Sequence, residues 1–261
     1  MTGIGVGVGL AFAAAALAPA PYSFLGSDLY AAWDAERRDQ FSLSGSQVNN
    51  WADAIASQPV AQAFGVSKPL YLPAGFYGRP GVIFDGIDDY LEMLGVGNLP
   101  IGAEPCEIWA LVDQQSDGAV HTSARNVISW GSSTSTSRRL RRTVSNNTSL
   151  AQAVLGFGEG LGQGIPSNLS VPFDGPKLVR VRVEAGGPTR ANVSINTNLG
   201  IFANLTSLAT GNMNLRIGSQ EGSGPGGYWQ GVMNLLLVTK LLDTAASSRL
   251  TTDLMARGGL V

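Results

Sequence analysis

The acidic residues of this chain are not spaced for cleaving a glycosidic bond. Retaining glycosidases hold two carboxylates about 5–5.5 Å apart across the bond. On a strand such a pair occupies positions i and i+2 or i+4, because alternate side chains face the same side. Glu104 and Glu107 are three residues apart and would face opposite sides. A glycoside hydrolase is therefore not predicted.

Histidine and cysteine chemistry is equally sparse. The chain has one His and one Cys, His121 and Cys106, which excludes a Cys/His zinc site and an internal disulfide. His121 would need a neighbouring nucleophile to act as a base, and the sequence has no G-x-S-x-G phrase. It follows the turn signal Asp117-Gly118, so we interpret it as a surface loop residue. We predict no enzyme activity and no cofactor.

Three clustered aspartates are candidates for cation binding. Calcium binds clustered carboxylates and carbonyls, but the spacing of Asp85, Asp88 and Asp89 is not that of an EF-hand loop. Asp85-Gly86 is typical of a turn, where Asp side chains accept hydrogen bonds from nearby backbone amides. We favour the turn over a structural calcium ion, and the metal is left unknown.

Aromatic residues near Gly/Ser-rich stretches are the candidates for ligand binding. Trp130, Tyr228 and Trp229 lie beside such stretches, where a ring can stack on a sugar. We expect Trp33, Trp51 and Trp109 to lie in the core instead, where a large ring removes much apolar surface from water.

One basic run stands out in the middle of the chain. It comprises Arg138, Arg139, Arg141 and Arg142. Such a run can bind phosphate or an acidic glycan, or contact a neighbouring subunit. A solvated strand face or loop is the commoner arrangement, and it is the one we expect.

Short apolar runs separated by turn residues predict an all-β body from Leu29 onward. The clearest strand is Lys177–Glu184, where Val179, Val181 and Val183 alternate with the face of Leu178, Arg180 and Arg182. The valines should face the core and the other face water. Further strands are expected at Leu29–Trp33, Gly81–Phe84, Tyr90–Met93, Glu107–Val112, Asn126–Trp130, Ala191–Ile195 and Tyr228–Val238. We expect loops at residues 132–137 and 156–164.

One helix is predicted at the C-terminal end of the sequence. Asp243 can cap it, Ala246, Leu250 and Leu254 form an apolar stripe, and Gly258-Gly259 ends it.

Composition supports a folded domain and gives no sign of nucleic-acid binding. Of the 261 residues, 44% are hydrophobic and 14% charged, which is enough for a packed core. The net charge is −2, so no general attraction to nucleic acid follows. We treat residues 27–261 as one domain.

Residues 1–26 differ from the rest because the run from Gly3 to Ala18 is apolar and uncharged. It is shorter than the about 20 apolar residues that span a bilayer, so no membrane span is predicted. A secretory signal peptide would fit Ala16-Leu17-Ala18, but no Lys or Arg precedes the run. We favour an assembly arm that buries its apolar side chains on a partner. Those side chains are Ile4, Val6, Val8, Leu10 and Phe12.

Two blocks resemble the laminin-G-like branch of the concanavalin A-like lectin/glucanase fold. The first contains LYAAWDA (29–35), VNNWAD (48–53) and GRPGVIFDGIDDYLEM (78–93). The second is IGSQEGSGPGGYWQGVMNLLLVTKLL with the following helix (217–256). The resemblance implies a two-sheet antiparallel jelly-roll sandwich with one short C-terminal helix, preceded here by the extended apolar arm.

Domains of this family occur in bacteriophage particles and in secreted lectin-like modules. The resemblance therefore implies a virion structural protein, such as a head decoration, collar, fibre or tail component. Its arm would bind other virion proteins, and it would form a symmetric homo-oligomer such as a trimer. Contact with host-surface glycans is an added expectation. The alternative is a secreted carbohydrate-binding module or adhesin with a cleaved signal peptide.

Overall fold

The strand pattern of the sequence is borne out in the computed structural model. It describes residues 20–62, 67–114, 125–131, 136–145, 148–157, 164–166, 175–185, 189–200, 202–204, 210, 214–219 and 227–260. The arm residues Ile4, Val6, Val8, Leu10 and Phe12 lie outside these ranges, as does His121. No helix within the described ranges is both long enough and apolar enough to cross a membrane.

The first half of the chain contributes strands β1–β9 and two short 3-10 helices. These are η1 (Ser23–Asp28), β1 (Leu29–Asp34), η2 (Arg38–Gln40), β2 (Phe41–Ser44), β3 (Gln47–Ala52), β4 (Pro59–Ala61), β5 (Leu70–Phe76), β6 (Arg79–Asp85), β7 (Leu91–Leu94), β8 (Cys106–Gln114) and β9 (Arg125–Gly131).

The second half contributes the remaining strands and the helix. These are β10 (Thr136–Ser145), β11 (Thr148–Phe157), β12 (Gly164–Pro166), β13 (Pro176–Glu184), β14 (Arg190–Ile195), β15 (Asn198–Leu199), β16 (Ala203–Asn204), β17 (Asn214–Ile217), β18 (Gln230–Thr239) and α1 (Thr244–Gly258).

All ladders between these strands are antiparallel, and they form two series. One runs β1-β18-β8-β13-β14, with β15 and β16 on its far edge. The other runs β2-β3-β4-β7-β17-β9-β10-β11-β12. Strands β5 and β6 join them, because β5 pairs with β3 and β6 with β18. The predicted all-β sandwich with one C-terminal helix is confirmed.

The main core lies between the two series. Val179, Val181 and Val183 of β13 point into it, as the alternating pattern predicts. The same core cluster contains side chains of the other series such as Ile128 and Leu215.

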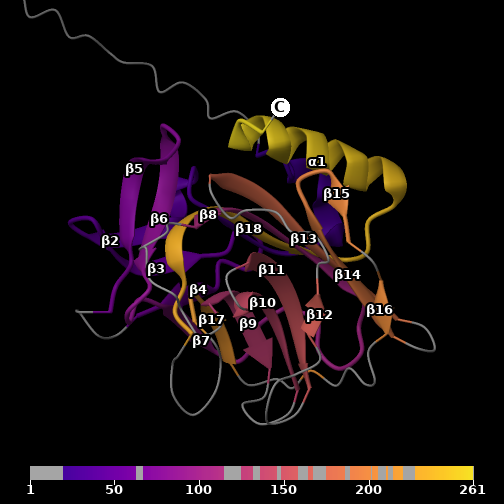
Figure 1. The fold of residues 1–261 in the computed structure, drawn as a ribbon. Coiled ribbons are helices and arrows are strands. Elements are labelled where there is room, and N and C mark those ends of the chain that lie inside the picture. Colours follow the sequence, from indigo (N-terminus) through magenta and orange to yellow (C-terminus); the bar gives the residue numbers. More distant parts are fainter. Residues whose placement is uncertain are drawn as a thin grey trace, which may run out of the picture.

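A second apolar cluster lies on the outer face of the first series, beneath α1 and η1 (Figure 1). Leu250 and Leu254 of α1 pack there, which confirms the predicted helix stripe. Leu178 is buried in this cluster, so the expectation that its strand face meets water is wrong. Tyr22 and Leu25 are buried there too, and the packed body therefore begins before the predicted boundary at residue 27.

Both predicted loops in the middle of the chain turn out to overlap strands. β10 begins at Thr136 and β11 extends to Phe157, with residues 132–135 and 158–163 outside the described ranges. The predicted solvated position of the basic run is wrong for Arg138, which is fully buried. Its Nη2 donates to the carbonyl of Glu104 (2.6 Å) and its Nε to Thr210 Oγ1 (2.9 Å).

Candidate ligand-binding groove

The outer face of β8 and β13 brings an aromatic ring and two arginines together. Residues 107 and 109 of β8 face outward because Ile108 and Ala110 face the core. Arg180 pairs with Trp109 in the ladder and Arg182 with Glu107, so side chains on the same face are neighbours. The Arg180 guanidinium lies 4.6 Å from the centroid of the Trp109 ring, a cation–π contact.

A buried carboxylate holds both arginines in place. Glu107 is fully buried, and its Oε1 accepts from Arg180 Nη2 (2.7 Å) and from Arg182 Nη1 (2.6 Å). Arg182 Nε donates to Glu184 (2.8 Å), which also binds Arg190 (2.7 Å). These hydrogen bonds lower the pKa of the Glu184 carboxyl, and the bond from Arg182 has the largest effect. The guanidinium groups are thus oriented before any ligand arrives.

Opposite the outer face of β8 and β13 lies a hydroxyl-bearing face of α1, which forms the other side of the site. Its residues are Thr244, Ser247, Ser248, Thr251 and Thr252. They recur at i, i+3, i+4, i+7 and i+8, the spacing of one helix face. The face lies beside the apolar stripe of Leu250 and Leu254, so burial of that stripe turns the hydroxyls toward β13 and β14.

Between α1 and the strands lies a groove of about 700 Å³, which we call the α1 groove. Its floor is formed by Trp109, Leu178, Arg180, Arg182, Ser194, Asn196, Thr197, Leu199 and Leu242, and Asp243 lies at the start of the helix wall. This volume falls within the about 300–1,000 Å³ of typical ligand sites. Trp109 is 1% exposed, as expected of a core tryptophan, and its ring packs against the Arg180 guanidinium. The groove therefore presents cationic donors, hydroxyls and the exposed Leu199, which suit a polar ligand that also has an apolar face.

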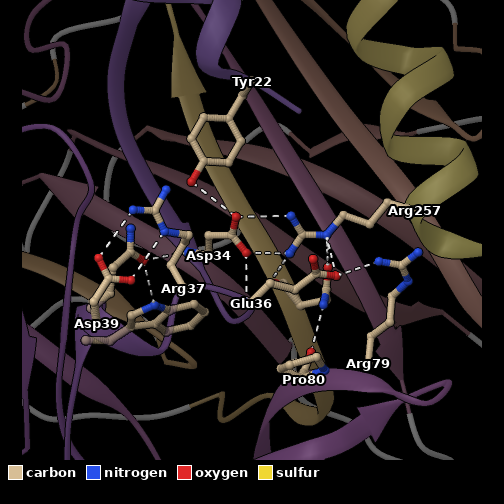
Figure 2. Close-up of polar contacts among 11 residues, drawn as sticks. Tyr22, Asp34, Glu36, Arg37, Asp39, Arg79, Pro80 and Arg257 are labelled. Carbon is tan, nitrogen blue, oxygen red and sulfur yellow. Dashed lines mark hydrogen bonds and ion pairs between the residues drawn. The ribbon is translucent and has the colours of Figure 1, made fainter. Parts of the chain in front are cut away.

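Figure 2 shows the polar network that fixes the far end of α1 on the sandwich. Arg257 of α1 binds the buried Asp34 of β1 through both carboxylate oxygens, and its Nε donates to Asn234 Oδ1 (2.6 Å). The Tyr22 hydroxyl donates to Asp34 Oδ2 (3.2 Å). Burial, and then the charge of Asp34, raise the pKa of the Tyr22 phenol. With this end held, the hydroxyl face of α1 keeps its place over the strands.

Two of the three predicted glycan-stacking residues lie in the core, so that expectation is corrected. Trp130 and Trp229 are 0% exposed, and Trp130 Nε1 donates to the Pro100 carbonyl (2.9 Å). Their ring faces are covered by protein and are not accessible to a sugar. Tyr228 is partly buried, with its ring 6.3 Å from that of Tyr90. The structure does not bring these three residues to the α1 groove.

The aspartate cluster shows the turn bonding that we favoured. Asp85 Oδ1 accepts from the amides of Ile87 (2.8 Å) and Asp88 (3.3 Å). One carboxylate oxygen from each of Asp85, Asp88 and Asp89 lies within 4.8 Å of the other two. Burial, followed by the neighbouring aspartates, raises the pKa of Asp89 to about 7, although an amide hydrogen bond from Asp85 opposes this. No cation is assigned to this cluster.

Comparison with known proteins supports the fold alone. No protein-family model matches the chain, and no curated protein sequence matches it at a significant level. Among solved structures, domain 4 of AbnA, a GH43 extracellular arabinanase from Geobacillus stearothermophilus in complex with arabinotriose, matches with a TM-score of 0.61 and 11% identity. The match covers 87% of this chain and 98% of that one.

Two carbohydrate-active enzymes match as well. A Trypanosoma rangeli sialidase gives a TM-score of 0.56 at 12% identity, covering 88% of this chain and 33% of that one. A GH54 α-L-arabinofuranosidase gives 0.51 at 10% identity, covering 80% and 51%. The class is therefore a lectin-like β-sandwich, a fold shared with domains of carbohydrate-active proteins.

Two sequence patterns indicate the side chains of the groove, but neither pattern alone predicts a groove. The Ser/Thr stripe of α1 has helical spacing, and Arg180 and Arg182 share one strand face. What the sequence could not show is that the two faces lie opposite each other, because this depends on the position of α1 over the sheet.

Proposed function

We propose that this protein is a non-enzymatic glycan-binding β-sandwich whose N-terminal arm anchors it in a virion. The observation that carries the binding function is the α1 groove, where Arg180, Arg182 and the exposed Leu199 lie opposite the hydroxyl face of α1. Sugars present both hydroxyls and an apolar C–H face. The groove offers hydrogen-bonding groups for the former and apolar contacts for the latter.

The absence of catalysis is supported by the carboxylates of the groove. Among its described lining residues Asp243 is the single acid, and its side chain accepts from the amide of Ala246 as the cap of α1. Glu107 lies beneath, bound to two arginines. Glycoside hydrolysis needs one carboxyl group that donates a proton and a second that acts as nucleophile or base. Glu107 is fully buried, so among the described lining residues Asp243 is the single carboxylate that a ligand could reach, one fewer than this chemistry needs.

The virion role is supported by the apolar composition of residues 1–26 and by the buried residues that directly follow the apolar run. The run from Gly3 to Ala18 is apolar and uncharged. It leads into Tyr22 and Leu25, which are buried beside α1. An apolar arm next to a fixed segment can bury its side chains on other virion proteins or on copies of the same chain. A symmetric homo-oligomer, such as a trimer, is part of this proposal.

Glycan binding is tested by screening the full chain on a glycan array. The variants are Ser248→Trp, which places a large ring in the groove, and Ala245→Trp, which places the same ring on an exposed α1 position outside it. We expect the wild type and Ala245→Trp to bind the same glycans and Ser248→Trp to lose at least tenfold in affinity. Equal binding by both variants would exclude the groove, and no binding by any would reject the proposed function.

The virion role is tested by gradient sedimentation of native source material, with mass spectrometry of the N-terminal peptide. The proposal predicts that the intact N-terminus sediments with large particles. A free chain that begins near residue 19 or 21 would instead indicate a secreted carbohydrate-binding module with a cleaved signal peptide.

A further inference from the structure

Arg180 in the floor of the α1 groove has hydrogen-bonding capacity that the protein leaves unused. Its side chain is 15% exposed, and Nη2 is bound to Glu107. Its Nε is buried and has no hydrogen-bond partner within the described part of the chain. A buried donor without a partner costs about 1–3 kcal/mol, more when charged, so such groups in native structures call for an explanation.

Trp109 provides a second donor of the same kind. Its side chain is 1% exposed, yet it lines the groove, and its Nε1 also lacks a partner among the described residues. The ring lies against the Arg180 guanidinium and is adjacent to it in the β8–β13 ladder. Both N–H groups are buried, so they lie beneath the groove floor, and a ligand can reach only the exposed part of the Arg180 guanidinium.

The floor of the α1 groove carries a net positive charge. Arg180 and Arg182 share the single Oε1 atom of Glu107, which leaves one positive charge in excess among these three groups. Arg182 is further neutralised by Glu184, whereas Arg180 makes no other ion pair that the described residues show. Asp243 caps α1 and keeps its negative charge at the start of the helix wall. Arg180 is therefore the group in the groove with positive charge to spare.

We propose that the α1 groove recognises saccharides bearing a carboxylate, and that the exposed part of the Arg180 guanidinium binds this group. This inference rests on the proposed glycan-binding function and names the ligand class. A carboxylate accepts several hydrogen bonds, and a bond from a guanidinium to it is charge-assisted and stronger than one to a neutral hydroxyl. The hydroxyls of α1 would then contact the remaining sugar hydroxyls.

The test measures the affinity of the full chain for matched acidic and neutral saccharides by calorimetry. The probes are sialyllactose against lactose and trigalacturonate against its methyl ester. In at least one pair the acid should bind about tenfold or more tightly than its neutral counterpart, since hydrogen bonds to charged groups contribute about 1.5–3 kcal/mol. This preference should weaken as salt is raised.

The Arg180→Lys variant tests the role of the guanidinium itself. Lysine keeps the charge opposite Glu107 but lacks Nε–H and the planar fork, so the preference for the acid should fall at least several-fold. Arg190→Lys is the matched control, because Arg190 is half-exposed and does not line the groove. Urea unfolding midpoints close to that of the wild type would show that both variants are folded.

The possible outcomes separate the two proposals. Equal affinity for the acidic and neutral members of both pairs would overturn the carboxylate assignment and leave glycan binding intact. An acid preference unchanged in Arg180→Lys would also overturn it. If none of the four probes binds, the carboxylate assignment fails, and an empty glycan array would show that the proposed function fails with it.

Discussion

At the residue scale, Arg257 and Asp34 form the most deeply buried ion pair that the described structure contains outside the groove. Replacing Arg257 with Met leaves the Asp34 charge buried with only neutral donors around it. We expect the free energy of unfolding to fall by about 3–5 kcal/mol. Urea denaturation measures this change. The control is Asp253→Asn, which removes an exposed pair with Arg249 (3.8 Å) and should change stability by less than about 1 kcal/mol. Equal effects would contradict the account.

Asp89 gives the protein a specific pH dependence. Its pKa is raised to about 7 in the folded state, against about 3.9 for an unperturbed aspartate. Between these values the folded state binds more protons than the unfolded state, so the Asp89 contribution to stability falls as pH rises and levels off above about 7. Asp89→Asn should remove this contribution.

Unfolding midpoints in urea between pH 4.5 and 8 measure this effect. The stability of Asp89→Asn relative to the wild type should increase with pH across this range. A difference in unfolding midpoint between Asp89→Asn and the wild type that stays constant with pH would mean that Asp89 does not titrate between pH 4.5 and 8.

Some of these residue environments follow from the sequence and others do not. Trp130 has the same strand parity as the core residue Ile128, so alternation predicts its burial, whereas the nearby Gly/Ser-rich loops had favoured an exposed ring. Trp229 precedes β18 and has no such pattern around it. The pairing of Arg257 with Asp34 joins residues 223 positions apart, which local patterns cannot reveal.

At the element scale, Arg138 ties β10 to the segment before β8. It donates to the carbonyls of Gly102 (3.3 Å) and Glu104 (2.6 Å), to Thr210 Oγ1, and to Cys106 Sγ (2.8 Å). Arg138→Ala removes these bonds and leaves buried acceptors unpaired. We expect a loss of about 3 kcal/mol or more, measured by thermal or urea unfolding. Arg139→Ala, on the same strand and partly exposed, should lose much less. Comparable losses would show that Arg138 has no special role.

The N-terminal cap of α1 links stability to the proposed glycan binding. Asp243 accepts from the Ala246 amide (2.7 Å), and it begins the wall of the α1 groove. Asp243→Ala should destabilise the protein by about 0.5–2 kcal/mol, measured by urea unfolding. It should also weaken glycan binding by fraying the first turn. Ala245→Gly is a control that weakens the same turn but retains the cap. If Asp243→Ala left both properties unchanged, the cap would not hold the groove wall.

Elements with a strong internal pattern were predictable, and those without one were not. The alternation in β13 and the cap, stripe and glycines of α1 identify these elements directly. In β10 four arginines conceal the alternation. One of them, Arg138, is buried because it donates hydrogen bonds to groups distant in the sequence, such as the carbonyl of Glu104 and the hydroxyl of Thr210. Tertiary contacts of this kind override a local pattern.

At the scale of the whole molecule, the groove exists because the sandwich has an additional layer. One face of the β1-β18-β8-β13-β14 series closes the main core, and the other carries α1 and η1 (Figure 1). α1 covers only part of that outer face. The uncovered part, over β13 and β14, keeps polar side chains at its surface and becomes the floor of the groove.

The sandwich class follows from the sequence because many short apolar strands and one terminal helix allow few arrangements. The layer order and the groove do not follow from it, because they depend on which strands pair across long separations. The likeness to domain 4 of the arabinanase, at 11% identity, shows how little of the fold is tied to particular residues. Function must therefore be argued from the groove, since one fold hosts many functions.

The most direct test of the central claim is a crystal structure of the full chain with the glycan that binds best on the array. The account predicts sugar density in the α1 groove, in contact with Arg180 and the hydroxyl face of α1. Density elsewhere, such as beside Tyr228 or on the opposite face of the sandwich, would contradict the assignment of the groove as the binding site.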